Sequence, residues 1–376
     1  MLNMFSNCGN LNYLDISHFS TSHVTSMMSM FSSTTSLKSL DLRNFDTSQV
    51  ESMTGMFLES GITSLDLSNF NTEKVRDMSF MFSYSASLKS LNIKGFNTKN
   101  VETMSYMFLK CESLTNLDLS SFNTSKTVYL YALVEGCSSL KSIDLSSFDT
   151  SQVTSIGNIF KDCVSLTSIE IRHFNTKNAA MMSRMFANCS SLTSLNLENF
   201  ETNEVNTMEE MFKDCTKLVN LDISKFTGTK VLTTANMFAN CYSLEKLEMP
   251  NFKENKATNM KNMFDSCSSL TSLNLGNFET NNVKNMNSMF RNCSKLANLD
   301  INKFDTTSVT DMGYMFNSCM NLKSLNLGSF NTQKCKNFEK MFDNCDGMEV
   351  YFYGDKCPNL PYYIPENVIP HDLSIE

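Results

Sequence analysis

Apolar side chains recur along this chain at fixed intervals. In the segment 296–319 they occupy Leu296, Leu299, Ile301, Phe304, Val309, Met312, Met315, Phe316 and Cys319. The same nine positions are apolar or Cys again 26 residues later, from Leu322 to Cys345. A fixed period of this size is typical of a solenoid, in which each repeat packs only against its neighbours.

The Phe near the end of each unit shows how far the repeat extends. It can be followed from Phe5 to Phe342, with Val134 in its place once, in steps of 26 residues and a single step of 25 between Phe57 and Phe82. The pattern therefore predicts one solenoid domain over residues 1–346. The chain begins halfway through a unit, so we expect that the N-terminal cap is absent and that the sequence is a fragment of a longer protein.

Two different spacings occur within each unit. Leu-x-x-Leu-x-Leu places its last two apolar residues at alternate positions, which predicts a short strand and, with one strand per coil, a parallel sheet. Val-x-x-Met-x-x-Met-Phe-x-x-Cys places apolar groups at 0, 3, 6, 7 and 10, which favours a short helix. The predicted fold class is α/β, a solenoid of about 14 coils with a parallel β-sheet on one side and short helices on the other.

Residues 347–376 do not follow the repeat and hold four of the five prolines. Proline interrupts sheet pairing, and the last core layer of a solenoid must be shielded from water. We therefore predict a capping strand at 351–353 followed by a Pro-rich tail. Cys357 in this tail is expected to be the most accessible thiol.

Composition narrows the possible partners. With 41% hydrophobic and 19% charged residues, the chain can bury a continuous interior. The net charge of −8 argues against nucleic acid, because phosphate binding needs clustered Lys and Arg. No run of about 18 apolar residues is present to span a bilayer. We therefore expect that nucleic acid is not a partner and that the chain has no membrane-spanning segment.

Eleven of the 13 cysteines share one register, from Cys8 through Cys111 to Cys345. Zinc ligands must converge on one point, whereas this ladder places one thiol in each coil. Thr34, Ser60 and Ser85 replace Cys in three units, which indicates a small, half-polar core position. We therefore favour buried, reduced thiols over zinc or disulfides, and core filling as the role of most Met residues. The four His residues form no recognisable nucleophile–base pattern, so no catalytic residue, metal or cofactor is expected.

The residues between the inward Leu positions are predicted to lie on the exposed sheet face. One row of them is acidic, with Asn at intervening coils: Asp15, Asp41, Asp66, Asp118, Asp144, Glu170, Asp222, Glu248 and Asp300. This row has two interpretations, a solvated face that prevents sheet stacking and an acidic platform for basic protein patches or cations. A Thr ladder from Thr21 to Thr332 is attributed to turn stabilisation. Tyr129 and Tyr131, in a deviating unit, are interpreted as a tolerated variant.

Two motifs recur often enough to suggest a family. They are LxxLDLSxF, as at 114–122 and 140–148, and VxxMxxMFxxC, as at 205–215 and 283–293. These units closely resemble the 26-residue repeat of bacterial surface proteins, the BspA-like branch of the leucine-rich repeats. The resemblance implies a non-enzymatic, extracellular or cell-surface scaffold for adhesion and protein binding, with a host or matrix macromolecule as partner. It does not name a ligand, because a shared fold does not carry a shared function.

Two other functions remain open at this point. The uncapped first coil would suit a structural protein that associates end to end into filaments. Reduced cysteines would also suit an intracellular scaffold for protein interactions.

Overall fold

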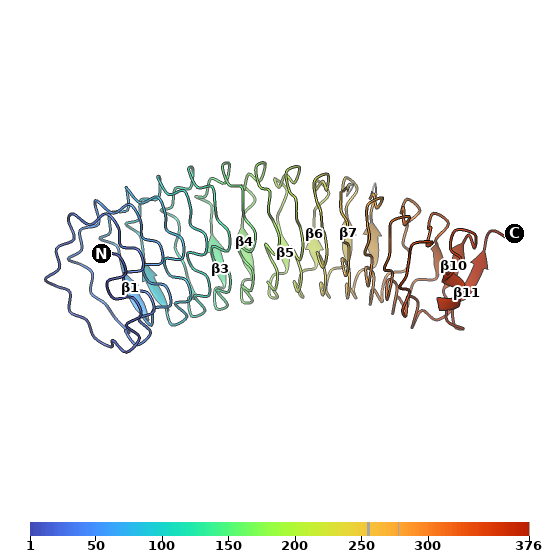
Figure 1. Ribbon diagram of the computed structural model, residues 1–376, viewed down its shortest axis with the longest axis horizontal. Helices are drawn as coiled ribbons and strands as arrows, with labels where there is room; N and C mark the ends of the chain where they lie inside the picture. Colours follow the sequence, from blue (N-terminus) through green and yellow to red (C-terminus); the bar gives the residue numbers. More distant parts are fainter. Residues whose placement is uncertain (254–255, 277, 376) are drawn as a thin grey trace. The chain divides into compact units, whose positions relative to one another are not determined.

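The computed structural model describes residues 1–253, 256–276 and 278–375 (Figure 1). These residues form a β-solenoid in two compact units. Unit 1 comprises Met1–Ala179 and Asn188–Ser191, and unit 2 comprises Ala180–Ala187 and Leu192–Glu376. In each unit, successive coils lie side by side with their short strands aligned (Figure 1). The predicted repeat solenoid with a parallel sheet is confirmed.

Unit 1 contains two pairs of parallel strands. They are β1 (Ser64–Asp66) with β2 (Ser90–Asn92), and β3 (Ser142–Asp144) with β4 (Ser168–Glu170). Leu65 lies opposite Leu91, and Ile143 lies opposite Ile169, so the 26-residue period sets the register. Leu65 and Ile143 are buried between exposed neighbours, as the alternating pattern predicts.

Unit 2 contains a four-stranded and a three-stranded parallel sheet. The first comprises β5 (Ser194–Leu195), β6 (Asn220–Leu221), β7 (Lys246–Glu248) and β8 (Ser272–Asn274). The second comprises β9 (Ser324–Asn326), β10 (Glu349–Phe352) and β11 (Ile369–Asp372), with β10 in the middle. A 3₁₀-helix, η1 (Leu360–Tyr363), connects β10 to β11.

The prediction of helices on one side of the coil is wrong. Among the described residues the only helical element is η1. In the segment that starts at Met27, alternate N–H groups bond to the next coil: Met27 N–H donates to the Ser52 carbonyl at 3.1 Å and Ser29 N–H to the Thr54 carbonyl at 2.9 Å. Directly after Ser29, Met30 N–H donates to the Met27 carbonyl at 3.2 Å, which closes a turn of four residues. The fold is therefore all-β rather than α/β.

Left-handed residues explain why these segments turn instead of forming a helix. Ser29 and Ser33 have φ angles of 52° and 54°, and most coils carry a pair of residues with positive φ at these two positions. A left-handed residue breaks the run of right-handed dihedrals that a helix needs. The apolar spacing of 0, 3, 6, 7 and 10 thus comes from consecutive tight turns that direct Met and Phe inward.

The predicted number of about 14 strand-bearing coils is also too high. The described residues contain eleven strands, β1 to β11. Some coils, such as the one at 114–119, keep the buried Leu positions without forming a strand. The Leu pattern reports burial, whereas a strand also needs aligned partners on the neighbouring coil.

A column of Phe rings forms the centre of each unit. In unit 2, Phe238 lies between Phe212 and Phe264, with ring centroids 5.4 and 5.5 Å away and planes tilted by only 6° and 3°. In unit 1, Phe57 and Phe82 are stacked at 5.6 Å. All five rings are buried, so the core read from the repeat is confirmed.

The described cysteines are free thiols, and all but Cys8 are buried. In unit 1 the Cys111 thiol donates a hydrogen bond to the Phe82 carbonyl of the preceding coil at 3.1 Å, and in unit 2 Cys241 does the same to Phe212 at 3.2 Å. Ser85 makes the equivalent bond at 2.7 Å. The prediction of a small, half-polar core position is confirmed, and its role is to satisfy a buried carbonyl.

The expectation that Cys357 is accessible is wrong. Its side chain is buried, and its sulfur lies 3.5 Å from the Phe330 carbonyl. The Cys357 N–H donates to the Tyr353 carbonyl at 2.9 Å, so the chain turns back over the preceding coil after β10. This turn brings the thiol inward in a segment where no repeat pattern could indicate it.

We expect only Cys8 to react when the folded protein meets a thiol reagent at pH 8. The other thiols are buried, and burial raises the pKa of most of them, to about 12 for Cys137 and about 11 for Cys345, so little thiolate is present to react. The measurement is the number of thiols modified before and after denaturation, with the modified residues identified by peptide mapping. Modification of Cys357 at the rate of Cys8 would contradict the burial described here.

The 25-residue unit between Phe57 and Phe82 lacks one residue in the turn that contains Gly61. Gly61 N–H donates to the Thr34 carbonyl at 3.1 Å, in the preceding coil. A Cβ atom on Gly61 would lie only 2.0 Å from the Thr35 carbonyl oxygen. The deletion of one residue from this unit is therefore tolerated because Gly61, which lies at the shortened turn, has no side chain.

Candidate functional site

The predicted acidic row lies on the outward side of the strand segments, and we call it the sheet-side row. Its members are exposed: Asp15, Asp41, Asp66, Asp118, Asp144 and Glu170 in unit 1, and Asp222, Glu248 and Asp300 in unit 2. Strand pairing fixes their register. Asp144 of β3 lies opposite Glu170 of β4, and Asp66 of β1 lies opposite Asn92 of β2.

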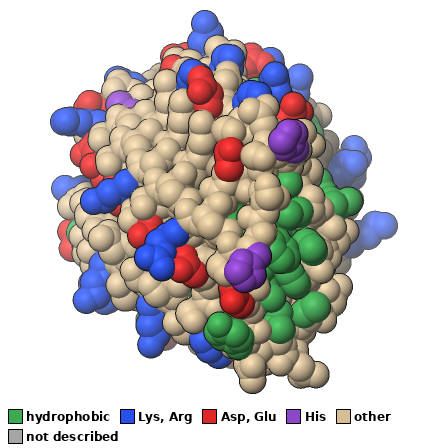
Figure 2. All heavy atoms as spheres, turned by 90° about the vertical axis from the view of Figure 1, so that its left-hand side faces the viewer, with side chains coloured by type: hydrophobic (Ala, Val, Ile, Leu, Met, Phe, Trp, Pro, Cys, Tyr) green, Lys and Arg blue, Asp and Glu red, His purple; other side chains and the backbone are tan. Residues whose placement is uncertain are grey.

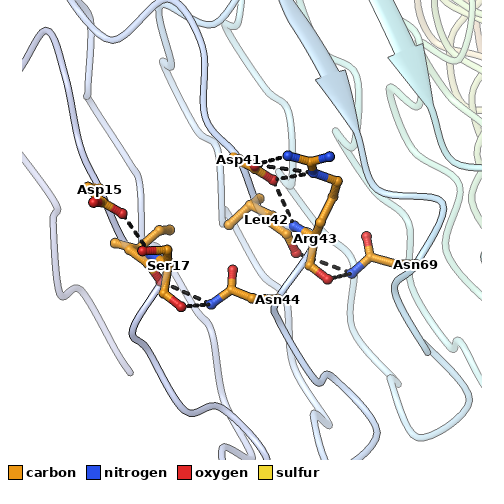
Figure 3. Close-up of polar contacts among 8 residues, drawn as sticks. Asp15, Ser17, Asp41, Leu42, Arg43, Asn44 and Asn69 are labelled. Atoms are coloured by element: carbon orange, nitrogen blue, oxygen red, sulfur yellow. Dashed lines mark hydrogen bonds and ion pairs between the residues drawn. The ribbon is translucent and has the colours of Figure 1, made fainter.

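Each aspartate of the sheet-side row closes a local turn. Asp15 Oδ1 accepts a hydrogen bond from the Ser17 N–H at 2.9 Å, and Asp41 Oδ1 accepts one from the Arg43 N–H at 3.1 Å (Figure 3). The same bond to the second following residue is made by Asp66, Asp118, Asp144, Asp222 and Asp300. It is the Asx turn, in which a short side chain replaces a backbone acceptor.

Asparagine makes the same turn wherever it occupies the row. Asn196 Oδ1 accepts from the Glu198 N–H at 3.0 Å, and Asn326 Oδ1 accepts from the Gly328 N–H at 2.8 Å. The interchange of Asp and Asn therefore reflects a need for one side-chain oxygen at a fixed distance. Glu170 departs from this rule and instead pairs with the Arg172 guanidinium at 3.3 Å.

Hydrogen bonds within these turns lower the pKa of most of the aspartates. The backbone N–H of Ser17 lowers the pKa of Asp15, and that of Ser146 lowers the pKa of Asp144. The hydrogen bonds from the Arg43 guanidinium lower the pKa of Asp41 to about 2. The row therefore carries negative charge at neutral pH and well below it.

A shallow hollow of about 1060 Å³ runs along the sheet side of unit 1. Tyr13, Asp15, Asp41 and Asp66 are among the residues that line it. Beside it, the Asn44 amide donates to carbonyls of the preceding coil, including that of Ser17 at 3.2 Å (Figure 3). This hollow is polar and open along its length, which suits an extended macromolecule better than a small enclosed ligand.

One family profile matches the sequence along most of its length, at residues 1–114, 86–195, 165–273 and 258–353. The family is described as Mycoplasma protein of unknown function, DUF285. The chain belongs to the DUF285 family. Its description assigns no activity to its members, so membership identifies the repeat without identifying a ligand. No curated protein matches the sequence.

Several solved structures are similar to the DUF285 chain. A leucine-rich repeat protein from Bacteroides ovatus shares 16% identity over 90% of this chain and 88% of that chain, with a TM-score of 0.39. A leucine-rich repeat protein from Leptospira interrogans shares 12% over 88% and 96%, with a TM-score of 0.30. The Toll–Spätzle complex of Drosophila shares 15% over 81% and 46%, with a TM-score of 0.32. Because these TM-scores are below 0.5, we infer no function for this chain from the similarities.

Two further features concern metal-ligand clusters and membrane-spanning helices in the described part of the DUF285 chain. Within it, no three His, Cys, Asp or Glu side chains are grouped closely enough to hold a metal ion. The same residues include no helix with the length and hydropathy needed to cross a bilayer.

The sequence prediction missed that Tyr129 and Tyr131, interpreted as a tolerated variant, belong to a larger aromatic group in unit 1, whose members are exposed or partly exposed. Phe80, Tyr84, Tyr106, Tyr129 and Tyr131 lie on the part of the coil formed by the Val-x-x-Met segments, which we call the turn side. Phe80, Tyr84 and Tyr129 are 37%, 48% and 51% exposed. The available signal was the gathering of aromatics over coils 76–131 at positions that other coils fill with small or polar residues.

Changing Arg43 to Ala should raise the pKa of Asp41 toward its usual value, because the hydrogen bonds from the guanidinium are lost. The folded-state pKa lies below the unfolded one, so the pairing stabilises the fold above about pH 4. That contribution is lost as the pH falls through about 2. Carboxyl titration by NMR measures the shift, with Asp144 as the internal control. An unchanged Asp41 titration in the variant would show that the ion pair does not form.

Proposed function

We propose that the DUF285 chain is a non-enzymatic scaffold that binds proteins through its sheet-side row. The observation that supports this most is the fixed geometry of the row, in which Asx turns hold one oxygen of each aspartate and strand pairing holds the coils in register. Charged groups that are already ordered lose little entropy on binding. When many such groups bind one partner at the same time, their individually weak contacts add up to a useful affinity.

The partner in this proposal is a basic surface of a host or matrix macromolecule. Surface carboxylates in a row attract positive charge, and the attraction weakens as salt screens it. The resemblance to BspA-like repeats supports a place at the cell surface or outside the cell and a role in adhesion. The shallow hollow of unit 1 supports a macromolecular partner over a small substrate.

The triple variant Asp118→Asn, Asp144→Asn and Asp222→Asn tests the role of charge without disturbing the turns, because Asn makes the same turn at Asn196 and Asn326. We expect its affinity for purified basic proteins at 50 mM salt to fall by about tenfold, at a cost of about 0.5 kcal/mol for each exposed charge. At 200 mM salt the difference from the wild type should shrink. Equal affinities of the two proteins at both salt concentrations would refute the acidic platform.

Protease treatment of intact source cells tests the proposed location. Peptides of this chain released from unlysed cells, with cytosolic markers retained, would support a surface scaffold. Their appearance only after lysis would refute adhesion and leave an intracellular scaffold as the better proposal.

Self-association into a structural assembly is a second candidate, and apolar side chains near the first residue favour it. Figure 2 shows hydrophobic side chains gathered on this end of unit 1. Leu2, Met4 and Tyr13 are 57%, 49% and 76% exposed. A sedimentation coefficient that rises with protein concentration would support this candidate, since an adhesion scaffold need not polymerise.

We further propose that residues 1–346 form the repeat domain and that residues 347–376 cap it. The pairing of β10 with β9 and of β11 with β10 supports a cap, because it extends the sheet beyond the last repeat. Tyr363 of η1 stacks on Phe338 of the last repeat at 5.2 Å, which also supports it.

A further inference from the structure

The exposed aromatic residues on the turn side of unit 1 form a continuous strip, which we call the aromatic strip. Phe80 stacks on Tyr106 with centroids 4.6 Å apart and planes tilted by 9°, and Tyr106 meets Tyr131 edge-on at 5.3 Å. Tyr84 and Tyr129 belong to the same turn-side segments and are about half exposed. Such rings combine a large apolar surface with hydroxyl groups, as is common at binding surfaces.

The solenoid itself does not require these rings. The register position of Phe80 and Tyr106 holds Ser29 and Ala132 in other coils of unit 1. In unit 2 most coils hold a polar or charged residue there, such as Asn262, whose amide donates to Asn236 Oδ1 at 2.9 Å, and one coil holds an isolated aromatic residue, Tyr314. The aromatic strip therefore replaces side chains that the fold accepts as small or polar, in consecutive coils of one unit.

One face of the Phe80 ring lies beside a position without a side chain. Tyr106 covers the ring from the following coil. In the preceding coil the same register position is Gly55, whose φ of 59° is left-handed. The three nearest atoms to a Cβ on Gly55 would belong to Ser29 and Leu58, at 3.4 to 3.9 Å, so neither is in steric conflict with it. The Phe80 ring is 37% exposed, and no ring of the described residues stacks on it from the Gly55 side.

Charge around the aromatic strip favours a cation. The turn-side segments 51–60, 76–86, 102–112 and 128–137 hold six acidic and two basic residues, and one of the six, Glu135, pairs with Lys161 of the next coil at 2.6 Å. Both basic residues are already engaged: Arg76 pairs with Glu102 at 3.2 Å, and the Lys110 amine lies 6.0 Å from the centre of the Tyr84 ring. The chain's own Lys110 shows that a cation is accommodated against these rings. A guanidinium group is the cation that stacks best on an aromatic face, since it is planar and weakly hydrated.

We propose that the aromatic strip is a docking surface for a basic polypeptide segment, with an arginine side chain lying on the open face of Phe80 above Gly55. This surface is separate from the sheet-side row and uses stacking as well as charge. It therefore selects arginine over lysine by stacking, whereas carboxylates prefer arginine only where they bind its guanidinium in a bidentate arrangement.

The test uses fluorescent peptides of alternating Arg and Gly, with matched Lys–Gly and Glu–Gly peptides, and the full chain. We expect the Arg peptide to bind best. Phe80→Asn should weaken it by about 3- to 30-fold, because one cation–π contact is lost. The variant should fold, since Asn occupies this left-handed position at Asn158, Asn236 and Asn262. Tyr314→Asn, at the same register position in unit 2, is the matched control and should leave affinity unchanged.

Gly55→Asn is the second variant, and it should reduce the preference for arginine by occupying the space beside Phe80. Its fold is checked by the denaturation midpoint, since the new side chain meets ordinary contact distances. The triple aspartate variant of the sheet-side row should keep the arginine preference, which separates this proposal from the preceding one.

Several results would overturn the proposal. They are equal binding of Arg and Lys peptides, and Arg-peptide affinity that Phe80→Asn does not change. Self-association or glycan binding that depends on Phe80, without Arg-peptide binding, would assign the strip to a second copy or to a sugar instead.

Discussion

Replacing Phe238 by Ala should destabilise unit 2 by about 4 kcal/mol, as should the same change at other rings of the column that are stacked on both faces. The ring is fully buried, and its stacking on Phe212 and Phe264 would be lost from both faces. Aromatic pairs add about 0.5–1.5 kcal/mol to the burial term, and a cavity would remain between two rigid coils. Urea denaturation followed by circular dichroism gives the free energy of unfolding.

Phe238→Leu is the matched control for this experiment. Val134 occupies the same position in unit 1 and is fully buried, so an aliphatic residue fits the column. We expect Leu to cost about half as much as Ala, because it fills most of the volume without stacking. A loss below about 1 kcal/mol for Phe238→Ala would show that the coils collapse around the cavity.

Replacing Thr98 by Val should cost about 2–4 kcal/mol although the two side chains have nearly the same shape. Thr98 Oγ1 donates to the Asn123 carbonyl at 3.0 Å and accepts from the Asn123 N–H at 2.8 Å, in the next coil. The side chain is only 1% exposed, so Val would leave both backbone groups without water or a partner. The Thr ladder therefore joins neighbouring coils, a role that turn stabilisation alone does not describe.

Thr98→Ser separates the hydroxyl from the methyl group. Ser retains both hydrogen bonds and should cost about 1 kcal/mol, for the buried methyl alone. The comparison needs the unfolding free energies of both variants. If Ser and Val were equally destabilising, the bridging hydrogen bonds would contribute little.

The sequence was sufficient to predict the core, because burial repeats with the period of the coil. It was not sufficient for the turn side, where apolar spacing alone favoured a helix. The missing signal was the type of residue between the apolar positions: Asn158, Asn236 and Asn262 share one left-handed column, and Asn188 and Asn240 share the other. Asn tolerates a positive φ better than most residues, so its recurrence at these positions indicates turns.

The alternation of buried and exposed residues placed the sheet-side row on the correct face. It did not predict the hydrogen-bond partners of the side chains in that row. Serine two residues after Asp66, Asp144 and Asp222 was the available indication of an Asx turn. A one-dimensional pattern shows which face a residue occupies. It does not show whether a carboxylate is engaged by its own backbone, since that depends on the dihedral angles of the turn.

The shortened coil at Gly61 shows how such a gene can change length. Recombination that adds or removes a whole 26-codon unit gives each backbone donor an equivalent acceptor one coil away, so it costs the protein little. Loss of a single codon displaces one coil against the next and here required a residue without a side chain, since a Cβ on Gly61 would lie 2.0 Å from the Thr35 carbonyl oxygen. Homologous genes should therefore differ mainly by multiples of 78 base pairs, and shorter in-frame deletions should coincide with glycine codons.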